Sequence, residues 1–188
     1  MTEPVARCLS PVRTEAPTER GGQRAGGRAP HVLDPAALPD HIDALYRAAW
    51  AMCGSRYDAE DLVQTTFAHV LKRRRVIRSG NERGYLLRAL RNTYSSRYRT
   101  LAARPKIVPL LEQHTHSDAD PAPSSARQIM EAIATAPPLF RDAVIAVDIL
   151  GLSYLEAAQS LGTREATITT RLYRGRQHIA RELSDRGV

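Results

Sequence analysis

The stretch from Gly151 to Ser184 constrains the fold of this chain most, because it has the pattern of two helices joined by a tight turn. Ser153 belongs to the residue types that cap helix N-termini, since its hydroxyl accepts from unpaired backbone N–H groups. Gly162 can end that helix in the left-handed backbone region without a Cβ penalty. Thr163 is the expected N-cap of the next helix, with Glu165 in its first turn. The pattern predicts a helix-turn-helix whose second helix enters a DNA major groove.

Apolar and polar residues divide the two helices of this unit into an inner and an outer face. The residues expected to face inward recur at helical spacing, and they are Leu152, Leu155, Ala158, Leu161, Ile168, Leu172 and Ile179. Gly175 is expected to let a neighbouring element approach the second helix closely. The residues left on the outer face of that helix are Arg164, Thr167, Thr170, Arg171 and Arg174. A helical hairpin alone is weak evidence for DNA binding, because many such hairpins bind no DNA. The arginines on the outer face strengthen the prediction.

The segment from about Pro35 to Leu101 has the pattern of three further helices. The first is opened by Asp40 or Asp43 and broken at Gly54–Ser55. Asp58 is the expected N-cap of the second, and the third runs from about Glu82 to Tyr98. No strand-like alternation and no internal repeat is present, which predicts a helical bundle.

The domain organisation follows from composition. Residues 1–33 are rich in proline, glycine and arginine and are expected to be a disordered tail, followed by a first domain at 34–101. Residues 102–123 hold several prolines and small polar residues and are expected to be a flexible linker. A second domain at 124–186 begins near Ser124 or Ser125; Pro138 opens its next helix, which is expected to bury Leu139 and to be closed by Gly151. The fold class is all-α: two small helical domains joined by a flexible linker, the C-terminal one containing the helix-turn-helix.

Positive charge is concentrated in the first domain. The chain has 188 residues and a net charge of +7, and Lys72–Arg104 holds eleven basic residues against one acid, Glu82. Tyr85, Tyr94 and Tyr98 are interleaved with these arginines. Single-stranded DNA needs phosphate neutralisation and rings on which unpaired bases stack. The alternative places the tyrosines in the core, which we favour for Tyr85 and leave open for the other two.

Other functional classes have little support in the sequence. Cys8 and Cys53 make neither a disulfide framework nor a zinc site, so no metal and no cofactor is expected. The chain has no nucleophile motif, no paired carboxylates with a base and no glycine-rich phosphate loop, which argues against an enzyme. No apolar run approaches the roughly 20 residues of a membrane span, so a cytoplasmic protein without membrane insertion is expected.

Three motifs together resemble a known family. DAEDLVQTTF (Asp58–Phe67), LLRALRNTY (Leu86–Tyr94) and GLSYLEAAQSLGTREATITTRLYRGR (Gly151–Arg176) stand in the order and spacing of the extracytoplasmic-function sigma factors, a group of the sigma-70 family of bacterial RNA polymerase. The resemblance covers about Pro35 to Ser184. The first motif is the more specific one, because helix-turn-helix units occur in many regulators.

The resemblance implies roles for particular residues. The first motif would dock on the clamp helices of the polymerase β′ subunit, through Glu60, Asp61, Leu62, Gln64 and Phe67. The following loop and helix would open the promoter −10 element and hold a flipped base, through Ser79, Asn81, Arg88, Arg91 and Asn92. The helix-turn-helix would read the −35 element through Arg164, Thr167, Thr170, Arg171 and Arg174. The implied partners are core RNA polymerase (the β′ and β subunits), promoter DNA and an anti-sigma factor.

The sequence also departs from the family pattern, and two other functions remain open. Ala166-Thr167-Ile168 stands where the family often has Gly-Thr-Val, and Thr169 stands where arginine is frequent. A helix-turn-helix regulator that acts without polymerase would explain the C-terminal half alone. An interaction protein whose basic helices meet an acidic partner would show no preference among DNA duplexes.

Overall fold

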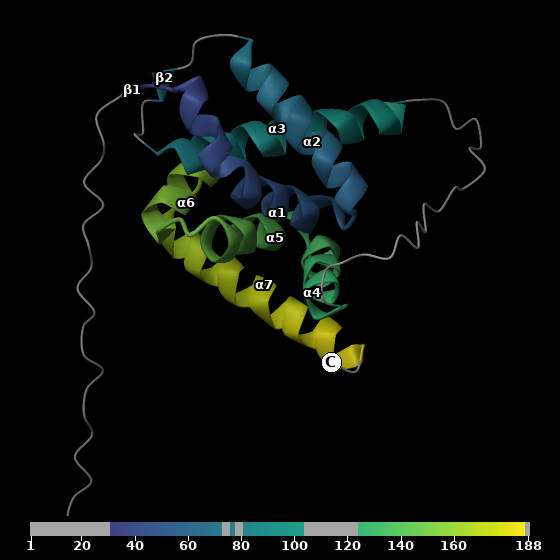
Figure 1. Ribbon diagram of the computed structural model, residues 1–188. Coiled ribbons are helices and arrows are strands. Elements are labelled where there is room, and N and C mark those ends of the chain that lie inside the picture. The colour runs from purple at the N-terminus through teal and green to yellow at the C-terminus, as the bar shows by residue number, and fades with distance from the viewer. Residues whose placement is uncertain (1–30, 73–75, 78–80, 104–123, 187–188) are drawn as a thin grey trace, which may run out of the picture.

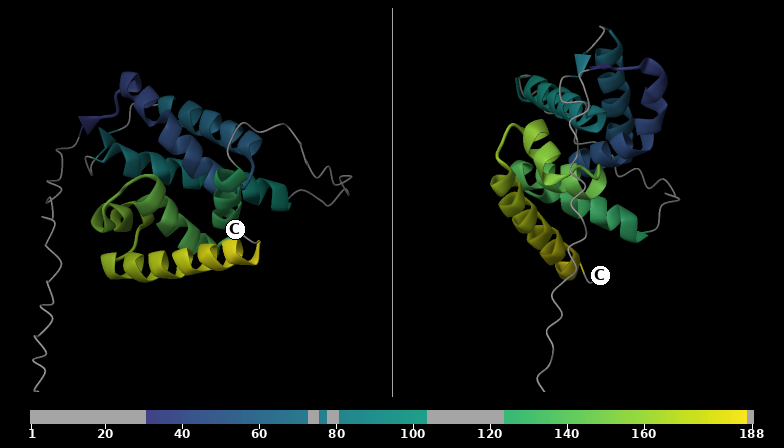
Figure 2. Two further views of the ribbon diagram at one scale, coloured as in Figure 1. Left: turned by 60° about the horizontal axis from the view of Figure 1, so that its bottom comes forward. Right: turned by 90° about the vertical axis from the view of Figure 1, so that its left-hand side faces the viewer.

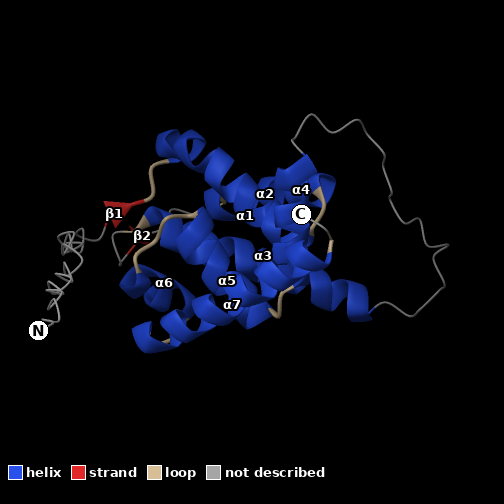
Figure 3. Ribbon diagram, turned by 90° about the horizontal axis from the view of Figure 1, so that it is seen from below, coloured by secondary structure: helices blue, strands red, loops and turns tan. Residues whose placement is uncertain are grey.

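The computed structural model describes residues 31–72, 76–77, 81–103 and 124–186. Within these ranges the chain forms seven α-helices and one pair of two-residue strands (Figures 1 and 3). The all-α fold class is therefore confirmed. Residues 104–123 of the expected flexible linker lie outside the described residues, as do the first 30 residues of the expected tail. Residues 102 and 103, which were expected to begin the linker, are helical.

The N-terminal half is a three-helix bundle preceded by a short 3₁₀ helix. The 3₁₀ helix η1 (Pro35–His41) leads into α1 (Ile42–Cys53), α2 (Arg56–Leu71) and α3 (Glu82–Ala103). Leucines at helical spacing fill the space between the helices, and Leu45, Leu62, Leu86, Leu87 and Leu90 are at most 1% exposed. The third helix extends five residues beyond the expected Tyr98.

The boundaries of these helices differ in part from the expected caps. Gly54 ends α1 in the left-handed region with φ of 72°, as its position predicted. The N-cap of α2 is Ser55, whose hydroxyl accepts from the backbone N–H of Asp58. The prediction that Asp58 caps this helix was wrong, because a serine three residues earlier supplies the oxygen and places Asp58 inside the first turn.

A short antiparallel strand pair was missed by the sequence analysis. Strand β1 (His31–Val32) pairs with β2 (Val76–Ile77), and Leu33 next to it is 7% exposed. Residues 31–33 therefore belong to the folded part of the chain, although they were expected to lie in the tail. Two-residue strands carry no alternation that a pattern search could detect.

The C-terminal half contains the predicted helix-turn-helix. Helix α4 (Ser124–Thr135) is followed by α5 (Pro138–Val144), a π-helical turn η2 (Ile145–Ile149), α6 (Tyr154–Leu161) and α7 (Glu165–Asp185). The long helix α7 runs along the other helices of this half (Figure 1).

The turn residues of this unit largely match the prediction. Ser153 accepts from the N–H of Glu156, whose carboxylate reaches back to the Ser153 N–H, forming a capping box. Gly162 adopts the left-handed region with φ of 63°. The residue at the N-cap of α7 is Arg164, not the expected Thr163, and its side chain makes no capping bond.

Packing in the C-terminal half depends on one close approach. A Cβ at Gly175 would lie 2.7 Å from Cγ2 of Val144, so the glycine lets α7 contact α5 directly. Two residues expected to face inward are instead half exposed: Leu139 at 54% and Leu155 at 50%. Both lie in the first turn of a short helix.

The two halves pack against each other. Helix α1 contacts α4 and η2, and α3 contacts α6 (Figure 2). The buried apolar residues of both halves form one continuous cluster, from Leu45 of α1 to Leu172 of α7. This direct packing was not anticipated from the sequence.

Candidate polymerase and nucleic-acid surfaces

The outward side of α2 carries the polar residues of the first motif. Glu60, Asp61 and Gln64 are exposed, because helical spacing turns them away from the bundle. Leu62 is 1% exposed, and Phe67 is half-buried against the core. The last two residues therefore hold the helix in place, while the first three form what we call the α2 polar face.

An arginine of α3 anchors one end of this face. The guanidinium of Arg97 donates to Asp61 Oδ2 at 2.8 Å and to Asp58 Oδ1 at 2.9 Å. All three side chains are at least 40% exposed, so each ion pair contributes little to stability. The contacts orient the Asp61 carboxylate, and the Asp61 side chain is still 57% exposed.

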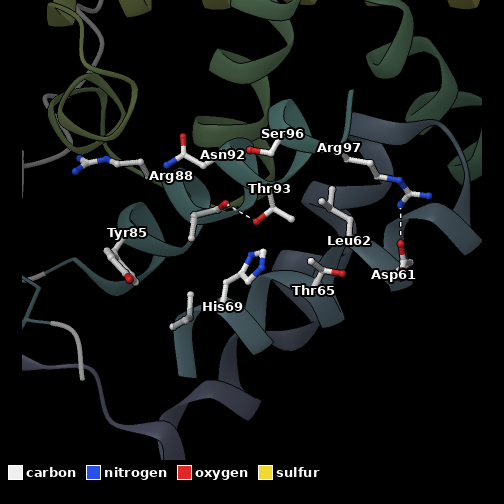
Figure 4. Close-up of a pocket in the computed structure, with 12 residues that line it drawn as sticks. Asp61, Leu62, Thr65, His69, Tyr85, Arg88, Asn92, Thr93, Ser96 and Arg97 are labelled. Atoms are coloured by element: carbon white, nitrogen blue, oxygen red, sulfur yellow. Dashed lines mark hydrogen bonds and ion pairs between the residues drawn. The ribbon is translucent and has the colours of Figure 1, made fainter. Parts of the chain in front are cut away.

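A cleft of about 670 Å³ lies between α2 and α3 (Figure 4). Helix α2 contributes a carboxylate, a hydroxyl and the His69 ring, and α3 contributes two arginines, an amide, hydroxyls and the Tyr85 ring. The residues lining it include Asp61, Thr65, His69, Tyr85, Arg88, Asn92, Thr93, Ser96 and Arg97. This size is within the range of pockets that hold small ligands.

The chemistry of the cleft suits an unpaired nucleobase. Tyr85 and His69 supply ring faces at one end, and the exposed Arg88 and Asn92 supply a cation and an amide (Figure 4). Stacking on a ring together with neutralisation of phosphate is the combination used for single strands. Tyr85 packs partly against the core, as expected, and also borders this cleft.

Several cleft residues were missed by the sequence analysis. These residues are His69, Thr93 and Ser96. Thr65 was expected on the polar face of α2, and it also lines the cleft. Helical spacing carried the signal: Tyr85, Ala89, Asn92 and Ser96 recur every three or four residues along α3, on the side that faces α2.

The residues expected to act on the −10 element do not form one site. Arg88 and Asn92 border the cleft. Arg91 faces the C-terminal half instead, where its Nε donates to Asp142 Oδ2 at 2.7 Å. Asn81 accepts from the N–H of Gly84 at 2.9 Å and so satisfies the start of α3. Ser79 lies outside the described residues.

The outer side of α7 presents the expected basic face. Arg164, Thr170 and Arg174 are exposed, while Thr167 and Arg171 are half-buried. The guanidinium of Arg174 lies 5.9 Å from the centre of the Phe140 ring. The structure therefore places Arg164 at the N-cap of α7 and the other four predicted residues on its first three turns. Tyr173, 64% exposed on the same helix, was not singled out by the sequence analysis.

Cys53 and Glu82 are among the ionisable groups near these surfaces whose pKa is perturbed. Burial, assisted by the charge of Asp58, raises the pKa of the Cys53 thiol to about 11. Hydrogen bonds from His41 and His31, at 2.9 and 2.8 Å, lower the pKa of Glu82. These hydrogen bonds connect Glu82, the first residue of α3, to His31 in β1 and His41 in η1, both of which precede α1.

The described ranges contain neither a candidate metal site nor a helix suited to a membrane. No cluster of three or more side chains there has a composition that suits a metal ion. None of the helices in that part of the chain is both long enough and apolar enough to cross a membrane.

Two family models match the chain. The model described as Sigma-70 region 2 matches residues 40–104, which include α1 to α3. The model described as Sigma-70, region 4 matches residues 126–179, which include the helix-turn-helix. The two matches stand in the order in which the sequence motifs were found.

Similar proteins agree with these matches. The chain is 34% identical over 161 residues to the ECF RNA polymerase sigma factor SigE of Mycolicibacterium smegmatis. The aligned stretch covers 78% of this chain and 62% of that protein, so the chain spans less than two thirds of this relative's length.

Two solved structures share the fold. One is the sigma factor RpoE in complex with the anti-sigma factor NepR from Bartonella quintana, with a TM-score of 0.56 and 20% identity over 79% of this chain and 97% of that one. The other is CnrH in complex with the cytosolic domain of CnrY, with a TM-score of 0.54 and 21% identity over 80% of this chain and 86% of that one.

Proposed function

The chain belongs to the sigma-70 family, in its extracytoplasmic-function group, and from this premise we propose that it is a subunit that directs core RNA polymerase to promoters. It binds core polymerase, recognises a promoter through two separate surfaces and captures an opened strand. The observation that supports this proposal most is the presence of both matched regions in one chain. A regulator acting without polymerase needs only the second.

The α2 polar face is the proposed contact to the β′ subunit. Glu60, Asp61 and Gln64 are exposed on a helix whose other side packs into the core through buried residues such as Leu62 and Val63. A rigid helix with fixed carboxylates suits a basic or amide-rich partner surface, because opposite charges steer association and fix register. The β subunit is a further proposed partner.

The proposed DNA contacts divide between the halves. The cleft between α2 and α3 captures an unpaired base of the −10 element, with Arg88 and Asn92 at its rim. The outer side of α7 enters the major groove at the −35 element, where its arginines contact guanine edges or phosphates. Capturing bases as they unpair offsets the unstacking cost of a few kcal/mol, so strand opening needs no nucleotide hydrolysis by this chain.

The proposal also covers partners and location. The two solved structures with this fold hold an anti-sigma factor and the cytosolic domain of a second protein, respectively. We extend this to a partner of the anti-sigma kind for this chain, acting in the cytoplasm. The chain itself supplies binding and no bond-making chemistry, which belongs to the polymerase.

The α2 polar face is tested by reversing one charge. Asp61→Arg is expected to weaken binding to sigma-free core polymerase at least tenfold, because it places a mismatched charge in the contact. Affinity is measured by fluorescence anisotropy of the labelled chain titrated with core enzyme.

Two controls separate this effect from others. Arg97→Ala removes the intrachain ion pair of Asp61 without reversing its charge, and Asp185→Arg reverses an exposed charge at the far end of α7. Both are expected to bind within about threefold of the parent chain. Equal affinity of Asp61→Arg and Asp185→Arg would remove α2 from the polymerase contact.

A further inference from the structure

Two histidines from the segment that precedes α1 donate to one carboxylate at the start of α3. Nε2 of His31 donates to Oε1 of Glu82 at 2.8 Å, and Nε2 of His41 donates to Oε2 at 2.9 Å. One histidine lies in β1, the other ends η1, and Glu82 is the first residue of α3. Both oxygens of one side chain therefore hold one segment of the chain. We call these three residues the Glu82 cluster.

The Glu82 cluster is partly shielded from solvent. The side chain of His41 is only 12% exposed, and Glu82 is half-buried. Nδ1 of His41 is buried and has no hydrogen-bond partner in the described part of the chain, so the bond from Nε2 to Glu82 orients this ring. A hydrogen bond to a charged group is stronger where water is kept away from it. The cluster therefore fixes where the start of α3 lies against the segment before α1.

A second contact joins the same segment to the connection between α2 and α3. Strand β1 pairs with β2 in a register that places His31 opposite Ile77. The side chain of Ile77 is buried in the core, and so is that of Leu33, which directly follows β1. The segment before α1 is therefore bound at two places, at β2 and at the first residue of α3.

Along the chain, Asn81 lies between these two places and directly precedes Glu82. Its Oδ1 accepts from the N–H of Gly84 at 2.9 Å, as the side chain of an N-cap residue does. The NH₂ group of the same amide makes no hydrogen bond to any described residue. Such a group donates to the ring nitrogens and carbonyl oxygens on the edges of unpaired bases. Asn81 thus keeps one half of its amide for the helix and has the other half for a ligand.

We propose that His31, His41 and Glu82 are positioning residues for capture of the opened −10 strand, and that they act through Asn81. The cluster fixes the start of α3 before the strand arrives, so the free-energy cost of ordering Asn81 does not weaken strand binding. Without the cluster the chain still folds, and it holds the strand less tightly. This inference rests on the proposed function and adds residues to it.

The Glu82 cluster lies apart from the other proposed surfaces. Its residues belong to β1, η1 and the first turn of α3, and the strand pair stands at the edge of the molecule (Figure 3). The cluster shares no residue with the α2 polar face or with the outer side of α7. Loss of the cluster is therefore expected to weaken strand capture and to leave binding of polymerase and of the −35 duplex unchanged.

Two double variants that differ in hydrogen-bonding capacity test the cluster. His31→Ala/His41→Ala removes both donors. His31→Gln/His41→Gln keeps an N–H donor at the end of each side chain. The control for stability is Ser153→Ala, which removes a helix cap in the other half of the chain. Urea unfolding identifies the variants that fold.

The measurement compares an opened and a closed form of one promoter. Each full-length chain is assembled with sigma-free core polymerase. The closed probe is a duplex recovered from a randomised promoter library with the parent chain, and the opened probe is the same DNA with the non-template strand of its −10 element unpaired. Affinities for both probes are measured by fluorescence anisotropy.

The ratio of the two affinities is the informative quantity. His31→Ala/His41→Ala is expected to lower the opened-to-closed ratio about fivefold, the effect of one lost hydrogen bond to the strand. The glutamine double variant and Ser153→Ala should keep the ratio of the parent chain, because neither removes the donors to Glu82. A general loss of stability would not change this ratio or be restored by glutamine.

A double-mutant cycle tests whether the cluster acts through Asn81. Asn81→Ser keeps an oxygen that can cap α3 and removes the NH₂ group. In this background, His31→Ala/His41→Ala is expected to lower the opened-to-closed ratio by no more than about 1.5-fold further, since the group that the cluster positions is already absent.

Three results would each overturn the inference: an unchanged ratio in His31→Ala/His41→Ala, an equal loss in the glutamine double variant, or full additivity with Asn81→Ser. If the alanine double variant does not fold, the same comparisons are made between His31→Ala and His31→Gln, at a side chain that is 34% exposed. Core-polymerase affinity is measured in parallel. Failure of the parent chain to bind core enzyme or to recover any promoter would overturn the proposed function, and this inference with it.

Discussion

Neighbouring residues of α3 have different surroundings because the helix turns by about 100° per residue. Asn92 borders the cleft with α2, while Arg91 is paired with Asp142 of the other half. At the start of the same helix, the Asn81 side chain accepts a hydrogen bond from the N–H of Gly84. The Glu82 carboxylate accepts hydrogen bonds from His31 and His41. The polar residues of one short stretch thus divide between lining the cleft, packing of the halves and capping of the helix.

Glu82 gives a prediction at the level of one residue. Its pKa is lowered chiefly by the hydrogen bond from His41 and then by that from His31. A carboxyl group whose pKa is depressed on folding stabilises the protein above its unfolded-state pKa, and this contribution is lost as pH falls through the folded-state pKa. Glu82→Gln should therefore lower the free energy of unfolding at pH 7 by about 1 kcal/mol, the usual size for such partly covered bonds.

The measurement is urea unfolding at pH 7 and at pH 4 and below. The difference between Glu82→Gln and the parent chain should shrink as Glu82 becomes protonated. A matched control is Glu165→Gln, an exposed carboxylate in the first turn of α7. A difference that stays constant across this pH range would mean that the histidine contacts of Glu82 do not stabilise the fold.

At the level of elements, sequence reasoning located the helices well wherever local chemistry decides their ends. Ser153, Gly162 and Gly54 act as predicted, because capping oxygens and left-handed glycines work within a few residues of sequence. The cap of α2 was misplaced by three residues because Ser55 and Asp58 both qualify and only the backbone path chooses between them. The strand pair was missed because β1 and β2 are joined only by long-range pairing.

Helix α7 carries a prediction at this level. Arg171→Ala should weaken binding to the −35 duplex by about 1–3 kcal/mol if the guanidinium contacts a base edge. The loss should then be confined to duplexes that carry the preferred sequence. Arg181→Ala, an exposed arginine ten residues further along the same helix, serves as the control and should change affinity little.

The affinities of the parent chain and the variants are measured with a duplex that carries the preferred −35 sequence and with a scrambled duplex, at one salt concentration. An equal loss on both duplexes would assign Arg171 to a phosphate instead of a base. Unchanged affinity on both would place this turn of α7 outside the DNA contact.

At the level of the whole molecule, the packing of the two halves was the feature that sequence could not supply. The contacts join residues 51 to 89 positions apart, such as Arg91 with Asp142 and Arg141 with Met52. Each of these side chains has an equally reasonable role on a solvated or DNA-binding surface. The family resemblance gave the order of the two regions. It did not give the contacts of Arg88 with the Gln159 carbonyl and of Arg91 with Asp142, which pair these two arginines within the chain.

The central claim is that this chain confers promoter specificity on core RNA polymerase. The most direct measurement adds the purified chain to sigma-free core enzyme with a library of randomised promoters, and sequences the transcripts. We expect transcription from a subset of templates that share two motifs at a fixed spacing, and strongly reduced transcription when Asp61→Arg replaces the parent chain. Transcripts no more abundant or selective than those of core enzyme alone, from a chain that still binds duplex DNA, would contradict it.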